Sequence, residues 1–178
     1  LFLPKSLSSP HYFYRQNRKW HKFNQKSSQV RIICIKFAHK FKDMNRKDFE
    51  IMAPVGSYES LYAAIQGGAD AIYFGIEGLN MRARSANNFT TDDLRKIAGI
   101  CDENGLKSYL TVNTIVYDED IALMHEIVNA AKEAKISAII ASDMATILYA
   151  RSIDVEVHIS TQVNVSNSEA ARFYAQYA

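Results

Sequence analysis

The sequence predicts an α/β fold with a parallel sheet, because short apolar runs alternate with longer segments of helical period from Phe49 onward. Polar residues follow nearly every expected strand, which is where a (β/α) barrel collects its site. No G-x-G-x-x-G turn follows the first strand, although a dinucleotide-binding open sheet needs one there. These observations favour a partial TIM-like (β/α) barrel over an open, doubly wound sheet.

About five βα units are expected in the regular part of the chain. Strands are predicted at residues 49–53, 71–75, 107–112, 138–141 and 155–160. Each is a short β-branched or apolar run, and right-handed crossovers join consecutive units of this kind. An eight-stranded barrel usually takes about 250 residues, so the sequence is expected to cover only part of one.

Helix boundaries carry their own signals. Helix starts are predicted at Thr90, Asp118 and Ser166, where a side-chain oxygen can accept from the free backbone N–H groups of the first turn. After Asp118 the apolar positions recur on one face, as in an amphipathic helix. Residues 67–68 and 104–105 contain glycine and are predicted to end helices in the left-handed conformation.

The composition is that of an ordinary globular protein. Of 178 residues, 48% are hydrophobic and 22% are charged, so the chain can bury a sizeable core as one domain at most. Its apolar runs are far shorter than a spanning helix needs, and no membrane segment is expected. Cys34 and Cys101 lie far apart without metal or redox spacing, which favours a reducing, cytoplasmic location and no cofactor held by this chain.

Charge divides the chain near Met44. Residues 1–43 contain ten Lys or Arg and one acid, whereas residues 44–178 contain eleven and eighteen. The first segment lacks the period of a strand or a helix and is predicted to be a disordered basic leader, with the barrel domain in residues 44–178. We favour translated upstream sequence as its origin. The alternatives are an RNA-binding arm and an organelle transit peptide.

Seven short motifs carry a family resemblance. They occur in order and at sensible spacing over about residues 49–178, and together they resemble the collagenase-like peptidase family U32. They are the segments 53–57, 68–75, 83–84, 88–90, 112–114, 142–143 and 158–164.

The resemblance implies a TIM-like barrel followed by an extra C-terminal region. Some members of this family are labelled peptidases or collagenases, and others support hydroxylation of tRNA or rRNA in connection with prephenate and an iron–sulfur cluster. The cluster cysteines of the family lie beyond the fifth βα unit, so the chain is expected to be an inactive N-terminal fragment. For the full-length relative we rank RNA hydroxylation ahead of proteolysis, and a non-catalytic anion-binding or assembly role is the third alternative.

One candidate catalytic residue and two loop amides lie at the last predicted strand. His158 shares the polar side of that strand with Ser160 and is expected to point into the barrel mouth, where it could act as a general acid or base. The alternative is a buried histidine bonded to a neighbouring hydroxyl or carbonyl. Gln162 and Asn164 extend the following loop and suit either a polar ligand or loop hydrogen bonds.

Further candidates for ligand binding follow the second and third strands. Arg82 and Arg84 could clamp a carboxylate or phosphate with two hydrogen bonds each, or form solvated ion pairs. Asn113 shares one side of its strand with Thr111 and is expected to face the open end of the barrel. Asp143 directly precedes a helical pattern, which favours a capping role. This set predicts a small anionic ligand at the mouth, and tRNA or rRNA as the larger partner.

Peptidase chemistry has little support in the motifs. The sequence contains no G-x-S-x-G elbow, and His125-Glu126 is not followed by the second histidine of a zinc-binding H-E-x-x-H motif. A peptidase assignment would therefore depend on the family resemblance alone.

Overall fold

The computed structural model describes residues 45–79 and 89–178. Residues 50–178 form one compact unit. Before it, residues 45–49 contain a single 3-10 turn, η2 (Arg46–Asp48), closed by a hydrogen bond from the Asn45 amide to Asp48 Oδ2 at 2.6 Å. The predicted basic leader, residues 1–43, lies outside the described residues.

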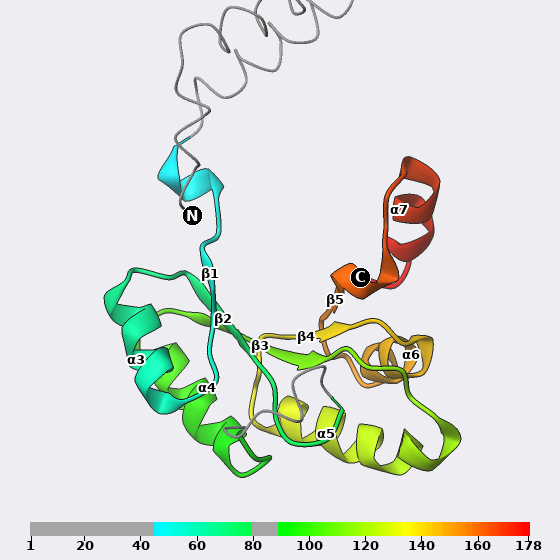
Figure 1. Ribbon diagram of the computed structural model, residues 1–178, viewed down its shortest axis with the longest axis horizontal. Coiled ribbons are helices and arrows are strands. Elements are labelled where there is room, and N and C mark those ends of the chain that lie inside the picture. Colours follow the sequence, from blue (N-terminus) through cyan, green and yellow to red (C-terminus); the bar gives the residue numbers. More distant parts are fainter. Residues whose placement is uncertain (1–44, 80–88) are drawn as a thin grey trace, which may run out of the picture. The chain divides into compact units, whose positions relative to one another are not determined.

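Strands and helices alternate along the unit from residue 50 onward (Figure 1). The strands are β1 (Met52–Pro54), β2 (Ala71–Phe74), β3 (Lys107–Val112), β4 (Ala138–Ala141) and β5 (Val157–Ile159). The helices are α3 (Tyr58–Gln66), α4 (Asp93–Glu103), α5 (Ile121–Glu133), α6 (Met144–Ser152) and α7 (Ser168–Tyr174). Two 3-10 turns, η3 (Asp118–Asp120) and η4 (Thr161–Val163), lie before α5 and after β5.

The strands form one parallel sheet in the order in which they occur in the chain, β1-β2-β3-β4-β5. Its register pairs Tyr73 with Tyr109, Thr111 with Ile140, and Ile140 with His158. Because successive residues of a strand point to opposite faces, these partners share one face of the sheet. A sheet in sequence order is what repeated right-handed βα units produce as they wind towards a barrel.

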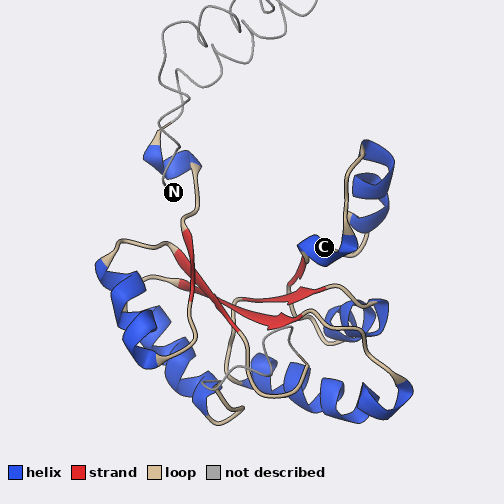
Figure 2. Cartoon of the chain, viewed as in Figure 1, coloured by secondary structure: helices blue, strands red, loops and turns tan. Residues whose placement is uncertain are grey.

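Helices α3 to α6 cover one face of the sheet (Figure 2), and the main core lies between them and that face. Its large, fully buried members include Leu61, Ile72, Phe74, Leu110 and Ile139. The opposite face carries a second cluster in which Ala71, Tyr109 and Ala138 are buried, with Tyr73 and Ile140 packed against it. A doubly wound sheet would be covered by helices on both faces. The fold is therefore a partial (β/α) barrel, as predicted, and the sheet is not closed.

The central strands β3 and β4 begin and end where the sequence predicts, whereas the two edge strands are shorter than predicted. At the start of β1, the Ile51 amide donates to the side chain of Asp70 at 2.6 Å, so the strand begins at Met52. At the start of β5, the Val155 amide donates to Ala150 O at 2.9 Å and belongs to the turn after α6. The predicted strands 49–53 and 155–160 were wrong at these ends.

The helix starts were predicted in part. Asp143 caps α6 as expected, since its Oδ1 accepts from the Ala145 amide at 2.9 Å. The cap of α7 is Asn167 rather than Ser166, because the neighbouring asparagine is an equally good capping residue. Asp118 begins the turn η3 instead of capping α5. At the start of α4, Asp93 Oδ2 accepts from both the amide and the hydroxyl of Thr90 at 2.9 Å. The acid of the predicted cap is therefore in place, whereas the Thr90 hydroxyl donates instead of accepting.

Two of the predicted helix stops have left-handed backbone. Gly68 and Gly105 have φ angles of 73° and 67°, a region that residues with a Cβ rarely adopt. Within the described residues, no helix combines the length and apolar character needed to cross a bilayer.

Candidate functional site

A polar cluster lies at the carboxyl edge of the sheet, and we call its members Asn113, Ser160 and Gln162 the carboxyl-edge cluster. Asn113 directly follows β3, Ser160 follows β5, and Gln162 lies in η4. The side-chain amide of Asn113 donates to Gln162 Oε1 at 2.9 Å across 49 positions of sequence. The hydroxyl of Ser160 donates to the same oxygen. Because carboxyl ends of parallel strands meet at one edge, residues far apart in the chain converge here.

Ser160 is the anchored member of this cluster. Only 4% of its surface is exposed, and its backbone amide donates to Ala141 O at 2.8 Å, which ties it to the end of β4. Its hydroxyl also accepts from the Gln162 amide at 3.4 Å. Asn113 is half-buried and Gln162 is exposed, so the cluster extends from the buried Ser160 to the protein surface.

Asn164 ends the turn η4 close to this cluster. Its backbone is left-handed, with φ at 55°, and its amide donates to Thr161 O at 3.0 Å. Asn164 also lines a cavity of about 1000 Å³ beside β5 and α7, together with Ser160, His158 and Tyr174. The cavity thus adjoins two of the predicted site residues, Asn164 and His158.

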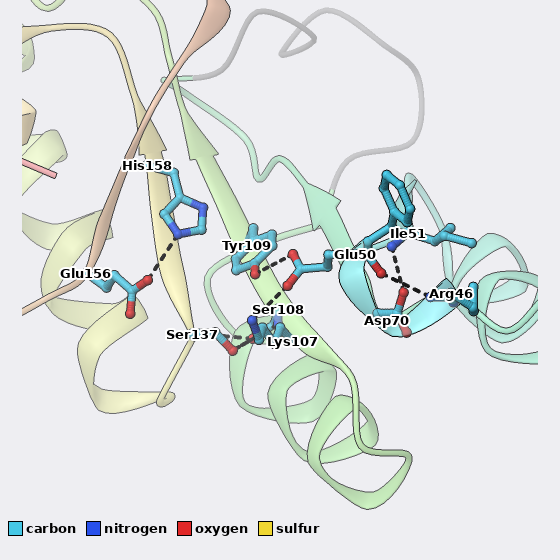
Figure 3. Close-up of polar contacts among 11 residues, drawn as sticks. Arg46, Glu50, Ile51, Asp70, Lys107, Ser108, Tyr109, Ser137, Glu156 and His158 are labelled. Carbon is cyan, nitrogen blue, oxygen red and sulfur yellow. Dashed lines mark hydrogen bonds and ion pairs between the residues drawn. The ribbon is translucent and has the colours of Figure 1, made fainter. Parts of the chain in front are cut away.

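His158 belongs to a different group of side chains from Gln162. Its imidazole Nε2 lies 3.0 Å from Glu156 Oε1, and its ring packs against Tyr109 with 4.8 Å between the ring centroids. Figure 3 shows the imidazole between these two partners. His158 shares the sheet face of Tyr109 and Ile140, opposite helices α3 to α6. Its hydrogen bond goes to Glu156, which precedes β5, and not to the amides at the carboxyl edge.

Near the amino ends of the strands, Tyr109 and His158 form part of what we call the amino-end cluster, with Glu50, Lys107 and Glu156. The Tyr109 hydroxyl donates to Glu50 Oε1 and the Lys107 ammonium donates to Glu50 Oε2, both at 2.7 Å (Figure 3). These bonds, from Lys107 first and then from Tyr109, hold the pKa of Glu50 below its usual range. Burial, followed by the bond to Glu50, raises the pKa of Tyr109 to about 12.

The sequence patterns did not point to Glu50 or Lys107. Glu50 lies 57 positions from Lys107 and 59 positions from Tyr109, and no local motif connects them. Only the pairing of β1, β2 and β3 brings them together. In barrels the amino-terminal face generally serves stability rather than chemistry, and the paired charges of this cluster suit that role.

Two described groups that could serve as nucleophiles, Ser160 and Cys101, are not placed to do so. A catalytic serine or cysteine must lie within hydrogen-bond reach of a base. Ser160 donates to an amide oxygen, while Cys101 is 1% exposed and burial raises the pKa of its thiol to about 11. In the part of the chain that the structure describes, no group of three or more His, Cys, Asp or Glu side chains is arranged to hold a metal ion.

Three further candidates complete the predicted set. Arg82 and Arg84, the predicted anion clamp, lie outside the described residues. Asp143 has a structural role, because it accepts from the Ala145 amide and, at 3.2 Å, from the Val116 amide. It thereby joins the loop after β3 to the start of α6.

Comparisons with known proteins agree with this architecture. The profile of peptidase family U32 matches residues 56–178. A collagenase from Porphyromonas gingivalis W83 is 71% identical over 135 residues, which are 76% of this chain and 33% of that protein. The tRNA hydroxylation protein P1 of Bacillus subtilis 168 is 32% identical over 129 residues, 71% of this chain and 30% of that protein. This chain thus spans about a third of the length of these relatives.

A solved structure shares the fold. The U32 peptidase Mk0906 superimposes with a TM-score of 0.58 and 13% sequence identity, covering 72% of this chain and 55% of the other. At this identity the likeness concerns the fold alone.

Proposed function

The chain belongs to peptidase family U32, and from this premise we propose that it supports the hydroxylation of tRNA or rRNA. The relative in Bacillus subtilis is named a tRNA hydroxylation protein. The hydrogen bond of Ser160 to an amide oxygen and the burial of Cys101 favour this function over acyl transfer, because within the described residues neither group is bonded to a base. The activity proposed is that of a protein with the full length of these relatives, of which this chain spans about a third.

The observation that carries the proposal is the convergence of Asn113 and Gln162 at the carboxyl edge of the sheet. Side-chain amides at such an edge suit a small, oxygen-rich ligand, because they offer both donors and acceptors. We propose a small anion as that ligand, with prephenate as the candidate that the family suggests. Arg82 and Arg84 are the proposed partners of its carboxylates, and Asn164 is the proposed third amide.

The described residues do not fit an iron–sulfur cluster. Clusters of this kind are held by several cysteine thiolates. Cys101 is the cysteine within the described part of the chain, and it is buried with its pKa raised to about 11. No step of the proposed function therefore passes through a cluster held by these residues.

Proteolysis is the second candidate, and the collagenase that is 71% identical over 135 residues favours it. In that case His158 would be the proposed general base. Its present bond to Glu156 at 3.0 Å would then orient the imidazole, as a carboxylate does in catalytic triads. Ser160 would not be the nucleophile in that case, since its hydroxyl donates to Gln162.

Calorimetric titration of the full-length protein with prephenate tests the first candidate. Replacing Asn113 by alanine should weaken binding about 2- to 12-fold, which corresponds to the loss of one neutral hydrogen bond of ~0.5–1.5 kcal/mol. Asn129→Ala is the matched control, because Asn129 accepts from Tyr149 on the helical layer at 3.1 Å. Equal affinities for wild type and Asn113→Ala would contradict the proposed site. Hydrolysis of gelatin that is lost in His158→Ala would instead favour proteolysis.

A further inference from the structure

The two sides of the Gln162 amide have different surroundings. Its oxygen accepts from the side chains of Asn113 and Ser160. Its nitrogen has no hydrogen-bond partner within residues 45–79 and 89–178, although an amide nitrogen carries two donors. A carbonyl oxygen has two lone pairs, so the oxygen of Gln162 is fully used by the protein.

Ser160 determines which way this amide is turned. Its hydroxyl oxygen accepts from the backbone amide of Gln162 at 3.4 Å, which leaves the hydroxyl hydrogen to be donated to Gln162 Oε1. Ser160 itself cannot shift easily, because it is 4% exposed and its backbone is bonded to Ala141 O. With its oxygen held by a buried residue, the exposed Gln162 keeps the donors of its NH₂ group for a ligand.

We propose that Gln162 is the specificity-determining donor of the carboxyl edge, and that Ser160 is a positioning residue that fixes its amide with the NH₂ group facing the ligand. This inference rests on the proposed function, since it concerns the same site. The ligand class that follows is a small carboxylate or keto acid, whose oxygens accept hydrogen bonds and carry the negative charge. A ligand that presents donors to this position would meet the wrong side of the amide.

The replacement Gln162→Glu tests the acceptor and the donor of the amide separately, because it keeps the acceptor oxygen and removes the NH₂ donor. A glutamate oxygen still accepts from Asn113 and Ser160, so the melting temperature should stay close to that of the wild type. The outward group changes from a donor to a charged acceptor, and affinity for carboxylates should fall at least about tenfold. Gln66→Glu, which adds the same charge at the exposed end of α3, is the control and should bind like the wild type.

Ser160 is tested through its coupling to Gln162. Ser160→Ala should weaken carboxylate binding several-fold, and Ser160→Thr, which keeps the hydroxyl, should restore most of it. In the Gln162→Glu background, Ser160→Ala should cause no further loss of affinity, because the donor that it positions is already gone. A serine with a purely structural role would lower affinity equally in both backgrounds.

The experiment is calorimetry on the full-length protein with prephenate, succinate and citrate as probes, with thermal melting of each variant. Binding by the wild type with unchanged affinity in Gln162→Glu would overturn the inference alone. A large drop in the melting temperature of Gln162→Glu would also overturn it, because the amide would then donate to its neighbours. Failure of the wild type to bind any of the three probes would contradict the proposed function and the ligand class together.

Discussion

The bond between Tyr109 and Glu50 should make a measurable contribution to stability. Tyr109→Phe removes one hydroxyl and keeps the ring, so its packing against His158 and Ala138 is retained. The lost bond is 2.7 Å long and its acceptor is a carboxylate, for which about 1.5–3 kcal/mol is typical. The Glu50 side chain is 36% exposed, so water can replace part of the lost bond. We therefore expect the free energy of unfolding to fall by about 1–1.5 kcal/mol.

Urea denaturation followed by circular dichroism measures this difference. Tyr117→Phe is the matched control, because Tyr117 is 62% exposed and losing its hydroxyl should leave the denaturation midpoint unchanged. Equal midpoints for Tyr109→Phe and Tyr117→Phe would refute the reasoning that the amino-end cluster stabilises the sheet.

The same bond predicts a dependence on pH. The folded-state pKa of Glu50 is lowered from its usual 4.5, chiefly by Lys107 and then by Tyr109. A carboxyl with a lowered folded-state pKa contributes stability that is fully present above 4.5 and is lost as the pH falls through the folded-state value. The advantage of the wild type over Tyr109→Phe should therefore be constant near neutral pH and shrink in acid. An advantage that grows in acid would contradict the assignment.

Three further predictions concern other parts of the chain. Asp143→Ala should lower the free energy of unfolding by about 1–2 kcal/mol in urea denaturation, because two backbone amides lose their acceptor, whereas Asp143→Asn should recover much of the loss. Deleting residues 1–43 should leave the melting temperature unchanged, and a clear drop would show that this segment contributes to the fold. The buried Cys101 should resist a thiol reagent at pH 8 until urea unfolds the protein, and rapid labelling of the folded state would contradict its burial.

The sequence predicted the bounds of the central strands because these depend on local patterns. β3 and β4 are apolar runs bounded by turns, and pairing on both sides uses their whole length. The edge strands β1 and β5 have a partner on one side only. Their ends are set by competing bonds, such as that from Ile51 to Asp70, which no periodicity indicates.

The part of the candidate site that the sequence predicted is the part set by the positions at which strands end. Asn113 and Gln162 were expected at the same edge, and the structure places them in direct contact. The partners of His158 were not anticipated. Tyr109 approaches it through the pairing of β3, β4 and β5, and the contact with Glu156, two residues earlier in the chain, belongs to no motif. Ser160 was noticed as polar, but its control over Gln162 depends on the direction of one hydroxyl.

Mass spectrometry of nucleosides tests directly whether the whole protein supports RNA hydroxylation. Digested tRNA and rRNA would be compared between cells that contain the gene and cells that lack it. One nucleoside bearing an added hydroxyl should disappear with the gene, return with the wild-type gene, and return poorly with Gln162→Glu. An unchanged set of nucleosides, accompanied by loss of gelatin hydrolysis, would contradict the proposed function.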